Sequence, residues 1–281
     1  MIRRLQGGQF WLFTQAEQAR VAAELARHLD TASARLVGPS RKDALVAALA
    51  VHEAGWTPID ANPPLSPQRY PLDALEAHWS LTFNAWGTTT DEALKLNDDY
   101  VALLVSVHGL QLSYDAGRPT ERASRFDPHE MRKHFMANKF QHRQIEIQEE
   151  LRPRLGMAID EPRRLGIAVD LINDGKERTF SNDYRWMQAL DLMSLSLLAT
   201  DVVAAPLGPI YSLEGQLETL RVSRVDASTM TVSPWPFAGK SIRIATEYRE
   251  YPAAPTRSQP EFQHAYAGLD PRKLELLVRP L

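Results

Sequence analysis

The 281-residue sequence contains no cysteine. This absence excludes disulfide frameworks, thiolate zinc sites and cysteine nucleophiles. Any metal ion would therefore need imidazole, carboxylate or amide ligands. The chain also lacks the G-x-S-x-G, P-loop and G-x-G-x-x-G motifs, which argues against acyl hydrolases, kinases and dinucleotide-binding enzymes.

No charge of one sign dominates the sequence, and no hydrophobic run is long. The sequence has 32 Lys and Arg residues and 35 Asp and Glu residues, which gives a net charge of -3. This charge argues against a general nucleic-acid binder. The longest apolar stretches contain serine and are much shorter than a membrane span. The first residues show no apolar signal-peptide region. We therefore expect a cytoplasmic protein with a small-molecule ligand and neither a nucleic-acid nor a membrane partner; the oligomeric state stays open.

Hydrophobic periodicity divides the chain into three parts. Residues 1–13 are typical of a β-hairpin around Gly7-Gly8, residues 14–200 of helices, and residues 201–281 of strands. Thr14 is the expected N-cap of the first helix. Helices are predicted at 14–29, 40–55, 72–86, 91–112, 128–151, 161–172 and 182–200, strands at 219–225, 229–233, 241–249 and 273–279, and a polar loop at 115–127. The predicted class is α+β, mainly α, with a small antiparallel β subdomain formed by the N-terminal hairpin and the C-terminal strands.

Four predicted helices each carry one polar side chain in an otherwise apolar stripe. These residues are Gln18, His52, His108 and Asp191. Taken singly, each histidine is typical of a hydrogen-bonded core residue. Asp191 alone can cap a neighbouring helix or pair with an arginine such as Arg185, and Gln18 alone can lie at the edge of its helix. Taken together, they can satisfy one another or surround a metal ion, and Glu53 can reach the same cavity from the flank of its helix. Nitrogen and oxygen ligands of this kind suit Zn, Fe, Mn or Ni.

The loop from Trp56 to Pro71 directly follows His52 and Glu53 and contains five prolines. A loop held by a rigid scaffold often shapes the mouth of a substrate pocket; a rigid connector is the alternative interpretation. We assign Trp56 and Asp60 to a substrate pocket on this basis, with three further candidates near the polar cluster, Gln15, Tyr100 and Arg185.

Several segments in order along the chain carry a family resemblance. They are Leu12 to Ala19, Ala48 to Trp56, Tyr100 to Gly109, Trp186 to Leu195 and Pro234 to Phe237. The sequence resembles the bacterial DUF3891 family in these segments. The order of their histidine and acidic residues is similar to the metal-ligand pattern of HD-domain proteins. The resemblance implies an HD-like helical core that holds one or two divalent metals, with Fe, Mn and Zn as the candidates.

The resemblance implies metal ligands at His52, Glu53, His108, Asp191 and Gln18, with Glu53 as the catalytic acid or base. The family pattern has histidine where this chain has Gln18 and aspartate where it has Glu53. An amide oxygen competes weakly with water for a metal, and glutamate moves the carboxylate outward by one methylene. The site is therefore either retuned, reduced to one metal or inactive.

The function implied by the resemblance is metal-dependent hydrolysis of a small phosphorylated metabolite. One alternative is a non-haem iron oxygenase that uses the same ligands. Another is a non-catalytic binding or scaffolding protein with a degenerate metal site, in which no metal is bound.

Overall fold

The computed structural model describes residues 1–32, 39–117, 128–157, 175–199, 207–211 and 217–281. The predicted helix at 161–172 and residues 118–127 of the predicted loop lie outside these ranges. Among the helices in the described ranges, none combines the length and apolar character needed to cross a membrane.

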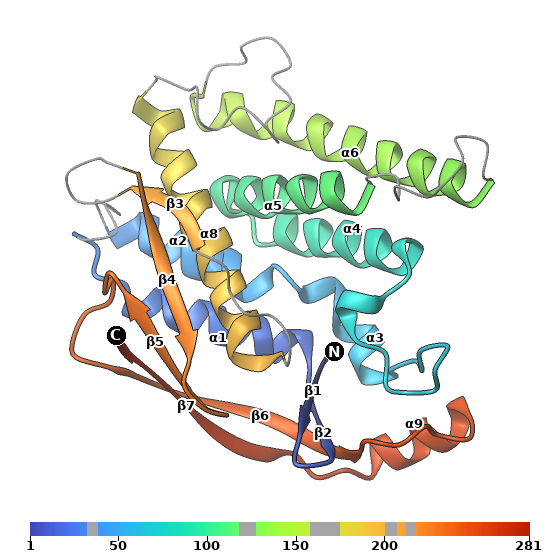
Figure 1. Cartoon of the computed structure of the whole chain (residues 1–281). Helices are drawn as coiled ribbons and strands as arrows, with labels where there is room; N and C mark the ends of the chain where they lie inside the picture. The colour runs from blue at the N-terminus through green and yellow to red at the C-terminus, as the bar shows by residue number, and fades with distance from the viewer. Residues whose placement is uncertain (33–38, 118–127, 158–174, 200–206, 212–216) are drawn as a thin grey trace.

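Helices form one side of the molecule (Figure 1). The first begins where the sequence predicts, because the Thr14 side chain accepts a hydrogen bond from the Glu17 backbone N–H. Two short 3₁₀ turns, η1 (Ala54–Trp56) and η2 (Ala74–Glu76), lie between longer helices. The α-helices are α1 (Gln15–His28), α2 (Pro39–Val51), α3 (Thr57–Ala61), α4 (Trp79–Lys95), α5 (Asp99–Gly117), α6 (Pro128–Arg154), α8 (Gly175–Leu198) and α9 (Gln259–Ala267).

The bounds of the two central helices differ from the prediction. A single helix was expected over 91–112, but α4 continues to Lys95 and α5 starts at Asp99. The break falls at Asn97, whose φ of 54° lies in the left-handed region. The Asp98 side chain then accepts hydrogen bonds from the backbone N–H groups of Tyr100 and Val101. Local side-chain hydrogen bonding, which apolar periodicity does not report, ends one helix and starts the next.

The strands form one seven-stranded mixed sheet in the order β1-β2-β6-β7-β5-β4-β3 within the described part of the chain. The prediction of a small antiparallel β subdomain is wrong, because β5 and β7 pair in parallel. The predicted N-terminal hairpin is confirmed and extends the sheet along β6. The strands are β1 (Ile2–Gln6), β2 (Gln9–Phe13), β3 (Leu207–Tyr211), β4 (Leu217–Arg224), β5 (Thr229–Ser233), β6 (Ile242–Pro252) and β7 (Arg272–Pro280).

The correction has a physical reason. Alternating hydrophobicity identifies a strand and its buried face but not its neighbour in the sheet. After α9 the chain returns as β7 and pairs with β6 on one side and β5 on the other. The prediction also missed β3, a short strand that contains glycine and proline. The result is a larger and curved sheet in place of a small appendage.

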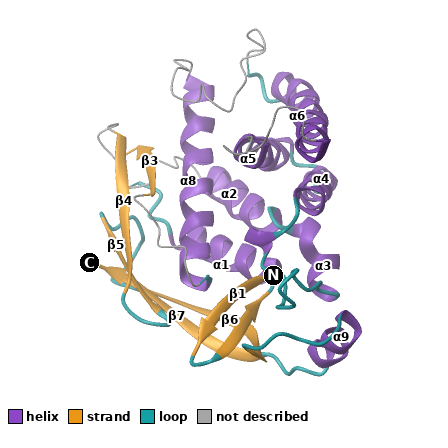
Figure 2. Ribbon diagram, turned by 45° about the vertical axis from the view of Figure 1, so that its right-hand side comes forward, coloured by secondary structure: helices purple, strands orange, loops and turns teal. Residues whose placement is uncertain are grey.

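The sheet curves around one side of α1 and α8 (Figure 2). Two arginines from strands far apart in the sheet order meet the same helix end. Arg4 of β1 donates to the Leu197 carbonyl over 3.1 Å, and Arg224 of β4 donates to the carbonyls of Ser196 and Ala199. Cations are favourable at the C-terminal end of a helix dipole. These contacts join the sheet to the C-terminal end of α8.

A close backbone contact fixes the turn after α2 against α4. The Gly55 N–H donates to the Thr89 hydroxyl over 2.9 Å. A Cβ atom at Gly55 would lie only 1.9 Å from the Ala85 carbonyl oxygen, so no larger residue fits there without movement of the backbone. This contact fixes the position of the segment that follows His52.

We expect Gly55→Ala to lower the free energy of unfolding by about 3 kcal/mol, because the new methyl group overlaps the α4 backbone. Gly87→Ala, in α4 itself, is the matched control. A Cβ there meets nothing within 4 Å, and the gain in helix propensity stabilises by about 1 kcal/mol. Urea unfolding of both variants checks the pair. Equal free energies of unfolding for the two variants would contradict the close contact between Gly55 and the α4 backbone.

Candidate metal centre

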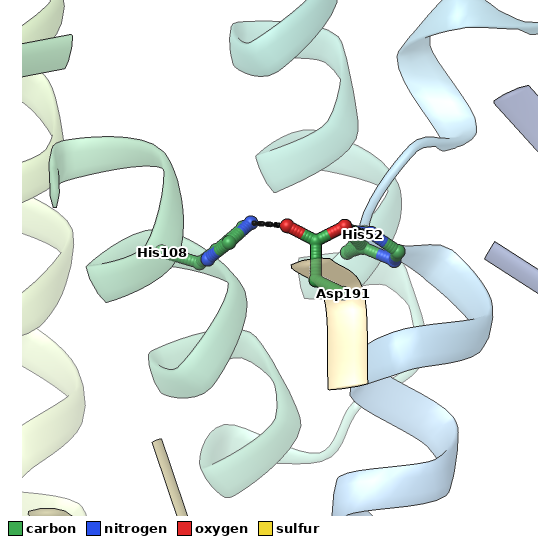
Figure 3. Close-up of side chains that lie close together, drawn as sticks. All are labelled: His52, His108 and Asp191. Atoms are coloured by element: carbon green, nitrogen blue, oxygen red, sulfur yellow. Dashed lines mark hydrogen bonds and ion pairs between the residues drawn. The ribbon is translucent and has the colours of Figure 1, made fainter. Parts of the chain in front are cut away.

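Three buried side chains from three segments converge in the helical layer. His52 directly follows α2, His108 lies on α5 and Asp191 lies on α8. Figure 3 shows the Asp191 carboxylate between the two imidazole rings. One ligand atom of each residue lies within 4.8 Å of the others. The residues are 2%, 4% and 5% exposed, so bulk water has little access to the cluster.

The orientation of His52 is fixed by backbone. Its Nδ1 lies 2.6 Å from the carbonyl oxygen of Leu49. A carbonyl can only accept, so Nδ1 carries the hydrogen of this bond. Nε2 then faces Asp191 Oδ1 at 3.1 Å, and in the neutral ring it presents a lone pair to the cluster. Metal-binding histidines commonly use this arrangement, in which one ring N–H is held by a carbonyl or carboxylate.

His108 completes the cluster from the other side of the carboxylate. Its Nε2 lies 3.4 Å from Asp191 Oδ2. Neither ring nitrogen has a hydrogen-bond partner among the described residues. Buried polar atoms are normally satisfied, and a cation between the two imidazoles and the carboxylate would satisfy Nε2. The donor set, with His108 Nε2 held by this long contact alone among the described residues, fits a divalent metal.

Gln18 holds the carboxylate in place. Its Nε2 donates to Asp191 Oδ1 over 2.6 Å and to the Ser194 hydroxyl over 2.7 Å. In this arrangement the amide nitrogen, which cannot ligate a cation, faces the cluster. The Gln18 Oε1 is buried and has no hydrogen-bond partner in the described part of the chain. Gln18 therefore supports Asp191 from α1 and is not itself a ligand in this geometry.

Glu53 stands at the edge of the cluster. Its Oε1 lies 3.9 Å from His52 Nε2. Burial raises the pKa of Glu53 to about 8, and the negative charges of Asp191 and Asp60 add to this rise against the opposing charge of His52. A carboxyl group with such a pKa can both release and accept a proton near neutral pH.

The charges of the cluster oppose the effect of burial on its other members. Burial would lower the pKa of His52, but the hydrogen bond and charge of Asp191, helped by Glu53, raise it to about 9. Burial would raise the pKa of Asp191, but the two histidines hold it well below its usual range. The metal-free cluster is therefore an imidazolium and carboxylate pair at neutral pH.

Three of the five proposed pocket residues lie in α1, η1 and α3. Asp60 accepts a hydrogen bond from the Gln15 backbone N–H over 2.5 Å and forms an ion pair with the amino group of Met1. Trp56 is buried in η1, and its Nε1 has no hydrogen-bond partner among the residues that the structure describes. The Gln15 Oε1 is likewise buried without one.

The other two proposed pocket residues lie elsewhere. The Tyr100 hydroxyl donates to Asp183 Oδ2 over 2.6 Å, about two helical turns before Asp191. Arg185 is buried on α8 six residues before Asp191, a rotation of about 240° from it around the helix. Sequence reasoning missed the role of Asp183, although its spacing of eight residues from Asp191 is visible in the sequence.

The fold and the centre together define a protein with a mixed, curved sheet around two helices and a buried cluster of two histidines and one carboxylate. A family model with the description "Protein of unknown function (DUF3891)" matches residues 1–252. The chain belongs to the DUF3891 family, as its sequence segments predict. Searches of curated proteins and of solved structures found no match.

The pKa of His52 predicts how stability depends on pH when EDTA keeps the protein free of metal. A histidine whose pKa rises from 6.5 to about 9 stabilises the fold fully below pH 6.5, and the contribution is lost as the pH rises through 9. We expect a loss of about 3 kcal/mol between pH 6 and 9.5, and the raised pKa of Glu53 acts in the same direction.

The measurement is urea unfolding across this pH range. His52→Gln should have a smaller slope than the wild type, whereas the matched replacement of an exposed histidine, His264→Gln, should retain it. A wild-type stability that stays constant up to pH 9.5 would contradict the ion pair between His52 and Asp191.

Proposed function

We propose that the protein is a metal-dependent hydrolase of a small phosphorylated metabolite, with one divalent ion held by His52, His108 and Asp191. The observation that carries this proposal is the convergence of the three ligand atoms. Two imidazoles and one carboxylate suit Fe, Mn or Zn. Three protein ligands leave positions for water and substrate, as in catalytic zinc sites.

A bound divalent ion would supply a Lewis acid, which polarises a phosphoryl oxygen and lowers the pKa of water. The neighbouring residues supply orientation. The Leu49 carbonyl holds the His52 ring, and Gln18 holds Asp191 through its amide. Such supporting contacts raise metal affinity and fix the geometry of the ligands.

Glu53 is the proposed proton-transfer group. It lies beside the cluster without belonging to the three converging ligands. Its carboxyl group can accept a proton from the attacking water when ionised and return one to the leaving group. This neighbouring acid or base favours hydrolysis over a purely structural metal site.

The burial of the cluster favours a small substrate. Gln15 and Trp56 carry buried polar atoms without hydrogen-bond partners in the described ranges, and we assign them to contacts with the substrate. The order His52, Glu53, His108 and Asp191 is similar to the ligand order of HD-domain proteins, which supports phosphate-ester hydrolysis. A cytoplasmic location is part of the same proposal.

One observation favours a second candidate function. Two histidines and one carboxylate with open positions are also the ligand set of non-haem iron oxygenases, and dioxygen is small enough to reach a nearly closed site. The test loads the protein with Fe(II) under anaerobic conditions and then admits oxygen. Oxygen uptake, without release of phosphate from any ester, would favour the oxygenase.

Metal content tests the site directly. We expect about one equivalent of Mn(II), Fe(II) or Zn(II) to bind per chain in equilibrium dialysis. His108→Ala should weaken binding at least 100-fold, because it removes one of three ligands, while His264→Ala should not change it. Wild-type protein that binds none of the three metals would overturn the proposed function.

Glu53→Gln tests the proton-transfer role. The amide keeps the shape of the side chain and cannot transfer a proton at neutral pH. We expect metal affinity within a fewfold of wild type and a loss of phosphate-ester hydrolysis of roughly 100-fold or more. A hydrolysis screen over phosphate monoesters, with the wild type as reference, gives the comparison. Unchanged turnover in Glu53→Gln would assign proton transfer to another group.

A further inference from the structure

A second polar cluster lies on α2, α5 and α8; α5 and α8 also carry His108 and Asp191, and His52 directly follows α2. Arg41 of α2 donates to both carboxylate oxygens of Asp183 on α8, and it also donates to the Thr179 carbonyl over 3.2 Å. Tyr100 of α5 donates to Asp183 Oδ2 over 2.6 Å. The Asp183 side chain is fully buried. We call these three residues, Arg41, Tyr100 and Asp183, the polar triad.

The spacing between the polar triad and the metal centre is the same on two helices. Tyr100 and His108 are eight residues apart on α5, and their partners Asp183 and Asp191 are eight residues apart on α8. Eight residues correspond to about 12 Å of helix. The two contacts between α5 and α8 are therefore satisfied together in one register of the helices. A shift by one helical turn would break both.

Apolar packing alone does not choose this register. Every residue from Val101 to Leu110 on α5 is buried, so the helix is covered on all sides. Its apolar residues do not form a single stripe, so hydrophobic burial alone gives this helix no preferred face. Polar contacts with defined partners therefore add to what fixes the position of α5: Ser106 contacts α6, and Tyr100 contacts α8.

The energetics of a buried ion pair also indicate that the polar triad selects the helix register. Taking Asp183 and most of Arg41 out of water costs about as much as their attraction returns, so such pairs contribute little to net stability. Their best-attested role is to select one arrangement among several of similar packing. The Tyr100 hydroxyl links this pair to α5, which carries His108.

We propose that the polar triad positions the metal centre, with Tyr100 as the positioning residue that aligns His108 on α5 with Asp191 on α8. The proposal rests on the proposed function, because it concerns the geometry of the same centre. Metal ligands must be placed to within about 0.2 Å, and contacts that orient them typically change affinity 10- to 100-fold.

The test compares two tyrosine variants that each lose one buried hydroxyl contact. Tyr100→Phe removes the hydrogen bond to Asp183. Tyr251→Phe removes a 2.8 Å contact between the end of β6 and Thr256, which lies between β6 and α9. Co(II) is the probe, because its visible absorption reports coordination geometry as well as occupancy. Thermal unfolding measures how much stability each variant loses.

We expect Tyr100→Phe to weaken Co(II) binding at least tenfold and to change the visible spectrum, while Tyr251→Phe changes neither. Equal affinity and an identical spectrum for wild type and Tyr100→Phe would overturn the proposal. A loss of affinity in both variants would also overturn it, because the effect would then follow general stability. Should Tyr100→Phe not fold, Arg41→Lys, which keeps the charge but loses the bidentate contact, takes its place with the same expected result.

Nuclear magnetic resonance of metal-free protein separates this proposal from the proposed function. If the wild type binds no Co(II), the metal function fails, and the ring nitrogen signals of His52 and His108 decide the positioning role. Signals that shift in Tyr100→Phe but not in Tyr251→Phe support it. Signals that stay unchanged in both variants reject it.

Discussion

The carboxylate of Asp191 is the interaction on which the helical layer depends. It lies between two imidazoles and accepts a hydrogen bond from Gln18, so it joins α1, the end of α2, α5 and α8 at one point. A buried carboxylate without partners would cost several kcal/mol. These four segments must therefore pack together around the Asp191 carboxylate.

The same requirement explains the irregular segment after α2. His52 must turn toward Asp191 just as its helix ends, and the chain then passes so close to α4 that only glycine fits at position 55. This close passage places Glu53 at the edge of the cluster and Trp56 in the buried turn behind it. Backbone geometry near the centre and the chemistry of the centre are thus linked through a few consecutive residues.

Much of this could be predicted from the sequence. Gln18, His52, His108 and Asp191 interrupt apolar stripes on four helices, and helical periodicity is enough to show that each points inward. Periodicity does not show that the stripes meet at the same depth, nor that the amide nitrogen of Gln18, rather than its oxygen, faces the carboxylate. Tyr100 is a predicted neighbour of the polar cluster, but eight residues of helix separate it from His108. The sequence could not predict which strands pair. Hydrophobic and polar residues alternate along β5, β6 and β7 in the same way whether the neighbouring strand runs parallel or antiparallel.

The pairing of β2 with β6 has a consequence for how the protein is made. Leu12 pairs with Arg249, so the hairpin waits for its neighbour in the sheet until the chain has been synthesised as far as β6. Until then, Leu12 and Phe13, which are fully or almost fully buried in the finished protein, have no sheet to cover them. Contacts of such large sequence separation form slowly, and an open strand edge with apolar side chains invites association between nascent chains. Until β6 is made, the hairpin exposes apolar side chains and an unpaired strand edge, which are the features that chaperones cover during synthesis.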